Sequence, residues 1–282
     1  MISTFDDILA ALVYLVSCFV IFLIGKYVYQ IFHKSINVKD ELVEKDNFAF
    51  AVAHTGYFIG LLFSIGSAII GPSMGLQQDL TDIFSYGIMA IILLNLSVII
   101  NDKLILRKFS VRKEICEDRN AGTGVIEGAS AIATGLIILG SLSGEGSILT
   151  ALIFWVVGQL LLVLVSFVYN FITPYDIHEE IEKDNVAAGV GFAGAIVAFG
   201  ILIWFALAHD FLGWTESMIT IGIDVLIGIV LLPVVRFITD KILLPGQKLT
   251  DEIVNQEKPN VGVALIEAFA YIGGAVLITW CL

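Results

Sequence analysis

Charged residues and cysteines are scarce in this chain, and each shortage excludes a class of protein. Lys and Arg number 15, Asp and Glu number 27, and together they make up only 15% of the 282 residues. The net charge of −12 provides no basic surface, so we expect no nucleic-acid partner. The three cysteines, Cys18, Cys116 and Cys281, lie too far apart in sequence to suggest a disulfide framework or a thiolate metal site.

Apolar residues take the place of the missing charge. They make up 58% of the chain, and the mean hydropathy is +0.93. A helix of about 20 apolar residues, at about 1.5 Å per residue, crosses the hydrocarbon core of a bilayer. Eight such stretches occur, at residues 8–32, 48–70, 82–100, 120–142, 148–172, 186–208, 217–238 and 260–281. The sequence therefore predicts an all-α membrane protein with eight spans, no soluble domain and the lipid bilayer as its surroundings.

The basic residues are distributed very unevenly along these spans. All 15 lie in or next to the odd-numbered connections, and the termini and the even-numbered connections have none. Loops on the cytoplasmic side of a membrane are enriched in Lys and Arg. We therefore predict that the odd-numbered loops are cytoplasmic and that both termini face outward.

A short motif, Glu-x-x-Asn, comes before each even-numbered span. Its four copies are Glu44–Asn47, Glu117–Asn120, Glu182–Asn185 and Glu257–Asn260. The asparagines are 73, 65 and 75 residues apart, so the chain is a repeat of about seventy residues. Asn before a first helical turn caps free N–H groups, and acidic residues there favour the positive end of the helix dipole. A ligand site made by four helix starts around an axis is the alternative interpretation.

The repeat also predicts the symmetry of the protein. Each unit is a helical hairpin that enters from outside and turns in the cytoplasm, so all four units point the same way. Such parallel repeats are related by an axis along the membrane normal. Residues 101–106 resemble residues 239–244, at an offset of 138. We therefore expect two four-helix halves, residues 1–142 and 143–282.

The Glu-Lys-Asp-Asn signature at 44–47 and 182–185, the Ala- and Gly-rich helix after it and the four-helix half resemble one known family. This is the YjfL-like family of bacterial inner-membrane proteins, which is classed as a domain of unknown function. The resemblance covers essentially the whole chain as two tandem copies, although Arg119 and Pro259 replace the Asp of the signature. It implies a location in the bacterial inner (plasma) membrane and a membrane-stress protein as partner, and it provides no catalytic residues.

Small residues recur at fixed distances from each asparagine. Two, nine and thirteen residues after it come Ala49, Gly122, Ala187 and Gly262, then Gly56, Ala129, Gly194 and Phe269, then Gly60, Ala133, Ala198 and Gly273. Small residues on one helix face let helix backbones approach closely in lipid. We expect the even-numbered helices to form the inner set and the odd-numbered ones to face lipid. Self-association as a homo-oligomer is left open.

Ionisable residues occupy another position of the repeat, seven residues after the asparagine. That position holds His54, Glu127, Phe192 and Glu267. Ionisable groups inside a membrane are costly and mark functional sites. Together with Asp224, nearer the outer end of its span, they predict a channel or transporter for a cation, a proton or a small cationic solute.

The alternative function is a membrane-embedded scaffold or membrane-stress component without transport activity, in which the buried acids only hold helices together. No nucleotide-binding loop, zinc signature, catalytic triad or dinucleotide fingerprint occurs in the chain. We therefore expect neither an enzyme nor a cofactor nor a metal centre.

The predicted orientation can be tested by labelling. A cysteine introduced into the loop at residues 71–81 is expected to react with an impermeant thiol reagent applied from outside, whereas one near Lys108 is not. The reverse labelling pattern in intact cells would overturn the orientation.

Overall fold

The computed structural model describes residues 2–71, 73–143, 147–244 and 246–282. Within these ranges the chain is helical and has no β-strand. The long helices are α1 (Ile2–Phe32), α2 (Phe48–Gly66), α3 (Leu76–Leu104), α5 (Ala121–Ser143), α6 (Ile148–Ile172), α8 (Val186–Leu207), α9 (Trp214–Ile238) and α11 (Val261–Cys281). The short ones are η1 (Asp40–Glu44), α4 (Val111–Cys116), α7 (Ile177–Glu182), η2 (Thr239–Leu243) and α10 (Leu249–Ile253).

In the described part of the chain, eight helices are long and apolar enough to cross a membrane, as predicted. The largest differences from the predicted limits lie at α1 and α3, since α1 begins at Ile2 rather than at residue 8. Helix α2 ends at Gly66 rather than at residue 70, and α3 is longer at both ends than the predicted 82–100. The added turns of α3 contain Gln, Asp, Asn and Lys, which hydropathy excludes from a span but which a helix accepts where it leaves the hydrocarbon.

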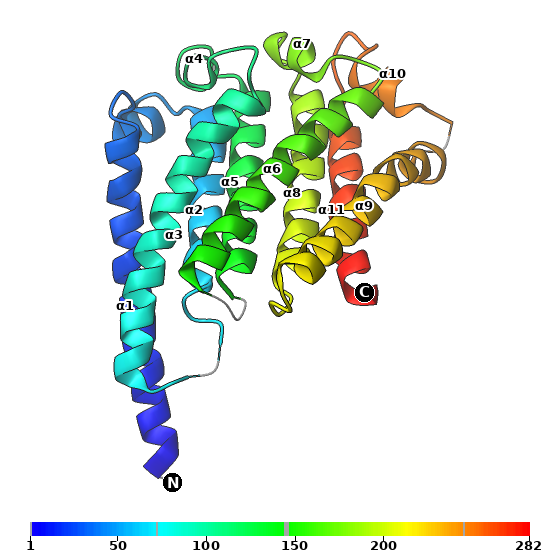
Figure 1. Cartoon of the computed structure of the whole chain (residues 1–282). Coiled ribbons are helices and arrows are strands. Elements are labelled where there is room, and N and C mark those ends of the chain that lie inside the picture. The colour runs from blue at the N-terminus through cyan, green and yellow to red at the C-terminus, as the bar shows by residue number, and fades with distance from the viewer. Residues whose placement is uncertain (1, 72, 144–146, 245) are drawn as a thin grey trace.

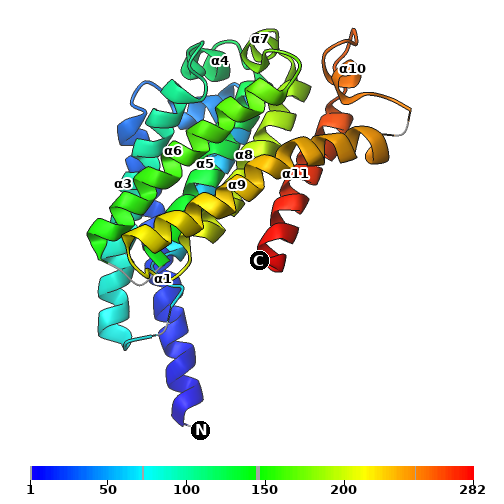
Figure 2. The same cartoon turned by 45° about the vertical axis from the view of Figure 1, so that its right-hand side comes forward.

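The spanning helices form two layers (Figures 1 and 2). Helices α2, α5, α8 and α11 lie side by side in a row, and neighbours in this row share the most extensive helix contacts of the fold. Helices α1, α3, α6 and α9 pack on one side of the row. Short helices α4, α7 and α10 lie together at one end of the bundle, and both termini point to the other end (Figure 1). We call the first of these the basic end, because its connecting segments hold most of the lysines and arginines.

The row corrects one interpretation of the repeat. Because α2 and α11 stand at opposite ends of an open row, the four helix starts do not surround a common axis. The prediction that the even-numbered helices are the inner set holds for α5 and α8, which are the most buried spans. It is wrong for α11, which is more exposed than α3 and α6 because no helix follows it in the row. Position in the row, rather than even number, decides burial.

Glycine and alanine set the distance between helices in the row. A Cβ atom built on Gly56 would lie 2.2 Å from the Cα atom of Gly128 on α5. Corresponding contacts follow along the row, since a Cβ on Gly194 of α8 would lie 2.3 Å from Cα of Ala268 on α11. Backbones this close gain dispersion contacts that lipid cannot replace. The small-residue columns of the first three units therefore lie at helix interfaces, whereas a Cβ on Gly262 or Gly273 of α11 would meet only residues of its own unit.

Substituting one of these glycines tests the packing. Gly56→Val must separate α2 from α5, and overpacking of this kind costs about 1–3 kcal/mol or more. Gly222→Val on α9 is the matched control, because no atom lies within 4 Å of a Cβ there. Thermal unfolding of the two purified variants in detergent is expected to show a lower Tm for Gly56→Val alone. Equal Tm values would contradict the close contact.

Candidate functional site

Each asparagine of the repeat caps the helix that follows it, as predicted. The amide oxygen accepts a hydrogen bond from the backbone N–H three residues on, at 3.1 Å for Asn47, Asn120 and Asn185 and at 3.2 Å for Asn260. This satisfies one of the donors that a helix start leaves free. The residue before the first three asparagines has a positive φ, between 48° and 60°, which turns the chain into the cap.

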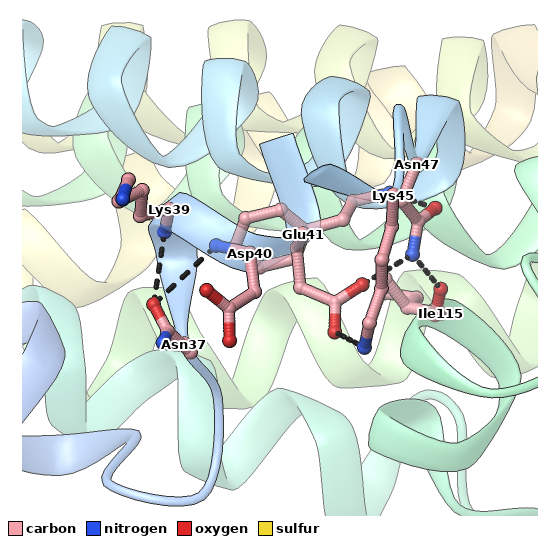
Figure 3. Close-up of polar contacts among 8 residues, drawn as sticks. Asn37, Lys39, Asp40, Glu41, Lys45, Asn47 and Ile115 are labelled. Atoms are coloured by element: carbon pink, nitrogen blue, oxygen red, sulfur yellow. Dashed lines mark hydrogen bonds and ion pairs between the residues drawn. The ribbon is translucent and has the colours of Figure 1, made fainter. Parts of the chain in front are cut away.

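The amide nitrogen of the same side chain makes two further bonds, which Asn47 illustrates (Figure 3). Its Nδ2 donates to Oε2 of Glu41 at 2.8 Å and to the carbonyl oxygen of Ile115 at 2.8 Å. Glu41 lies just before Asn47 in the same unit, whereas Ile115 belongs to α4 of the next unit. The asparagine therefore joins a helix cap, a buried carboxylate and the neighbouring hairpin.

These asparagine junctions repeat along the row. Asn120 donates to the Ile181 carbonyl at 2.6 Å, and Asn185 donates to the Ile253 carbonyl at 2.8 Å. Both acceptors follow a glutamate whose carboxylate is bonded by the asparagine of its own unit. Each unit is thus tied to the next one at the basic end by an equivalent bond.

The glutamates of the predicted motif are not the ones that bind. Glu44, Glu117, Glu182 and Glu257 are all exposed. The asparagine side chains instead donate to Glu41, Glu114, Glu180 and Glu252, at 2.8 to 3.0 Å. The motif glutamates therefore make none of these hydrogen bonds, and the prediction that they favour the helix dipole stays a prediction. The turn between the bonded Glu and Asn has a different length in different units, so a search for fixed spacing misses it.

The glutamates of the first two junctions differ in how readily they are protonated. Burial alone would raise the pKa of Glu41, but hydrogen bonds from Lys45, at 2.6 Å, and from Asn47 hold it below its ordinary value. Burial raises the pKa of Glu114, since Lys113 pairs with Asp118 instead. Glu41 therefore stabilises its junction at neutral pH and loses this contribution as the pH falls through its lowered pKa. Glu114 is protonated at a higher pH.

Two equivalent sites lie beyond the junctions, one in each half of the chain. The first-half site contains Tyr29, His54 and Glu127, and the second-half site contains Tyr169, Phe192 and Glu267. The tyrosines stand in matching sequences, Val-Tyr-Gln at 28–30 and Val-Tyr-Asn at 168–170. The other residues are the repeat position seven residues after each asparagine. His54 and Glu127 each lie beside Tyr29, about two helical turns from the basic end.

The second-half site is closed around a buried ion pair. Glu267 is 0% exposed, and its Oε1 accepts from Nη1 of Arg236 at 2.7 Å and from the Tyr271 hydroxyl at 3.3 Å. A Cβ on Gly191 would lie 2.6 Å from Oε2 of Glu267, so only glycine leaves room for the carboxylate. Tyr169 stacks on Phe192 with ring centroids 5.2 Å apart. The guanidinium of Arg236 is thus paired with the carboxylate of Glu267, and aromatic rings lie beside this pair.

The first-half site lacks the base that the second-half site has. Residue 98, which matches Arg236 at the offset of 138, is a buried valine. The carboxyl group of Asp102 lies within hydrogen-bonding range of that of Glu127 instead, and His33 lies near Asp102. Both acids keep partial exposure. The site therefore holds two carboxyl groups in contact, and it is more accessible than its counterpart.

His54 lies inside a cluster of rings. Its imidazole is 4.6 Å from the ring of Tyr29 and 4.3 Å from that of Phe58, between centroids. Its Nδ1 atom is buried and has no hydrogen-bond partner among the described residues. An unpaired buried nitrogen costs free energy, so a proton, a water molecule or a ligand atom beside it would be favourable.

Asp224 does not belong to either site. Its Oδ2 atom is 3.4 Å from Nε2 of His209, toward the end of the bundle that holds the termini. Sequence reasoning placed Asp224 correctly toward that end, but missed its histidine partner. It also missed Asp102 and Arg236, although Asp102 lies within the match of residues 101–106 with 239–244 and Arg236 lies just before it. Comparing the two copies position by position would have exposed the exchange of Val98 for Arg236.

Removing one member of the Arg236–Glu267 pair tests its role. Arg236→Met leaves a buried carboxylate without a counter-charge, which costs about 3–5 kcal/mol. Arg236→Met combined with Glu267→Gln is expected to recover most of that loss, because no charge then remains buried. Lys241→Met, which removes an exposed lysine, is the control. Thermal unfolding in detergent measures all three, and additive losses in the double variant would contradict a direct pair.

Comparison with known proteins supports the architecture. The family described as Domain of Unknown Function (DUF350) matches the chain twice, over residues 3–142 and 144–282. The UPF0719 transmembrane protein of Aquifex aeolicus (strain VF5) is 23% identical over 259 residues, which are 90% of this chain and 93% of that protein. No solved structure matches the chain. The predicted tandem copies of a domain of unknown function are confirmed, although neither match bears the name YjfL.

With eight apolar helices of spanning length in the described ranges and a transmembrane relative, the chain is a multi-pass integral membrane protein. It belongs to the DUF350 family, of which it contains two tandem copies.

Proposed function

We propose that this protein binds a cation or a proton at the first-half site and moves it across the membrane. The observation that carries the proposal is the contact between the carboxyl groups of Asp102 and Glu127 inside a bundle of membrane-spanning helices. Two carboxylates so close together cannot both stay ionised unless a cation lies between them. The pair therefore takes up either a proton or a positive ligand.

Neighbouring groups support this function. His33 lies beside Asp102, and its Nδ1 is 3.0 Å from the Tyr29 carbonyl oxygen. Tyr29 stacks on His33, with ring centroids 4.2 Å apart, and also contacts His54. Imidazoles and carboxyl groups exchange protons near neutral pH, and chains of them relay protons in membrane proteins. This chain of groups connects the carboxyl pair with the basic end.

The second acid of the repeat has another role in this proposal. Glu267 is neutralised by Arg236 and fully buried, so it is not the exchangeable site. We assign it to holding α11 against α9. This narrows the sequence-based hypothesis, in which Glu127 and Glu267 act alike.

The opposite end of the bundle supports cation entry. A cavity of about 300 Å³ lies there, lined by His209, Asp210 and Glu216 among other residues. Acidic walls raise the local concentration of cations. With the odd-numbered loops in the cytoplasm of a bacterial inner membrane, this cavity faces outward, and the carboxyl pair faces the cytoplasm.

Proton flux into proteoliposomes loaded with a pH-sensitive dye tests the proposal. Glu127→Gln with Asp102→Asn keeps the size and polarity of both side chains but removes ionisation, and is expected to abolish flux. Glu179→Gln at the exposed basic end is the matched control and is expected to retain it. Both variants must have the wild-type Tm in detergent, so that lost flux reflects the site.

Wild-type flux in the double variant would contradict the proposal. It would leave the alternative of a membrane-embedded scaffold, one that works with a membrane-stress partner or as a homo-oligomer.

A further inference from the structure

The two halves of the chain contain the same site in two states of occupancy. In the second half, the Arg236 guanidinium lies on Glu267, with Tyr169 and Tyr271 beside the pair. The guanidinium is a ligand that the chain itself provides, from helix α9. In the first half, Val98 takes the place of Arg236, and among the described residues no lysine or arginine pairs with Glu127.

We propose that the first-half site binds a small organic cation with an ammonium or guanidinium group, which takes the place that Arg236 takes in the second half. This inference rests on the proposed function, because it names the substrate class of the same site. The ligand would donate hydrogen bonds to Glu127 and Asp102 and neutralise the excess of acid.

The walls of the first-half site suit such a ligand. Tyr29 and His54 occupy the positions of Tyr169 and Phe192, so the carboxylate has aromatic neighbours in both halves. Carboxylates bind nitrogen cations by charge-assisted hydrogen bonds, and aromatic faces attract the same cations. A cation bound at the first-half site would therefore lie beside both carboxylates and aromatic rings, as the Arg236 guanidinium does in the second half.

The carboxyl groups of the first-half site are more exposed than the carboxylate of the second-half site. Glu267 is 0% exposed, whereas Glu127 and Asp102 both keep partial exposure. A cation provided by the chain needs no entrance, but one from solution does. The first-half site is therefore the exchangeable one.

A metal ion fits the site less well. Within the described ranges, no three side chains of His, Cys, Asp or Glu are arranged to hold a metal ion. Zinc and calcium sites need at least three such ligands or several oxygen donors. A nitrogen cation needs only the two carboxyl groups and the rings that are present.

Isothermal titration of the full-length protein in detergent with methylguanidinium chloride tests the inference. Wild type is expected to bind one equivalent. Asp102→Asn with Glu127→Gln is expected to weaken binding at least about tenfold, because a charge-assisted pair is lost. Arg236→Ala is expected to bind two equivalents, since methylguanidinium then also fills the emptied second-half site. Tetramethylammonium, which donates no hydrogen bond, is the control ligand.

Two results would overturn the inference. One is saturable binding to wild type that persists unchanged in the Asp102→Asn, Glu127→Gln variant, because the ligand would then lie elsewhere. The other is no binding to wild type, whether or not Arg236→Ala gains one equivalent. If Arg236→Ala does not fold, the comparison of wild type with the carboxyl variant still decides.

The outcome is separable from that of the proposed function. Proton flux that depends on Glu127 without methylguanidinium binding would remove the organic cation and keep the proton. Methylguanidinium binding without any flux would keep the site and its ligand class and remove transport.

Discussion

One side-chain amide at the start of each helix of the row organises this fold. Its oxygen caps the helix, and its nitrogen bonds a glutamate of its own unit. In the first three units it also bonds a backbone carbonyl of the next unit. Without these asparagines, the helix starts and the buried carboxylates would lose hydrogen-bond partners. The bonds that set the registration between neighbouring hairpins would be lost as well. Because the junctions lie at one end of the row, they also fix the height at which each helix enters the bundle.

The height at which each helix begins determines which side chains of neighbouring helices lie at the same level. Residues seven positions after each asparagine lie at a similar level, so His54 and Glu127 both lie near Tyr29, and Phe192 and Glu267 both lie near Tyr169. Glycine contacts between α2 and α5 and between α8 and α11 bring the backbones close enough for these side chains to share a site. Duplication therefore produced two sites from one pattern. The exchange of Arg236 for Val98 leaves the first-half site without the guanidinium that pairs with Glu267 in the second.

Because the helices form an open row and not a closed ring, the helices at its two ends have a neighbour in the row on one side only. Its middle helices, α5 and α8, have neighbours on both sides and can be built almost wholly from small and apolar residues. Its last helix, α11, has one side without a further unit, and there Phe269 replaces the small residue of the repeat. Terminal units of repeat proteins commonly differ from the inner ones in this way. The second-half site adjoins this last helix, and the Arg236–Glu267 pair ties α11 to α9.

Hydropathy, repeat spacing and helix-cap chemistry are local properties, and for that reason the sequence alone determined the eight spans, the tandem duplication, the capping role of Asn47 and its equivalents, and the small-residue interfaces. The partners of those residues are not local. Glu41 rather than Glu44 bonds Asn47 because an irregular turn, not a fixed spacing, sets their approach. Asp102 and Arg236 reach Glu127 and Glu267 from helices that the tertiary structure alone places beside them. Whether a buried carboxyl group meets another acid or a guanidinium depends on that packing, which no periodicity in the chain records.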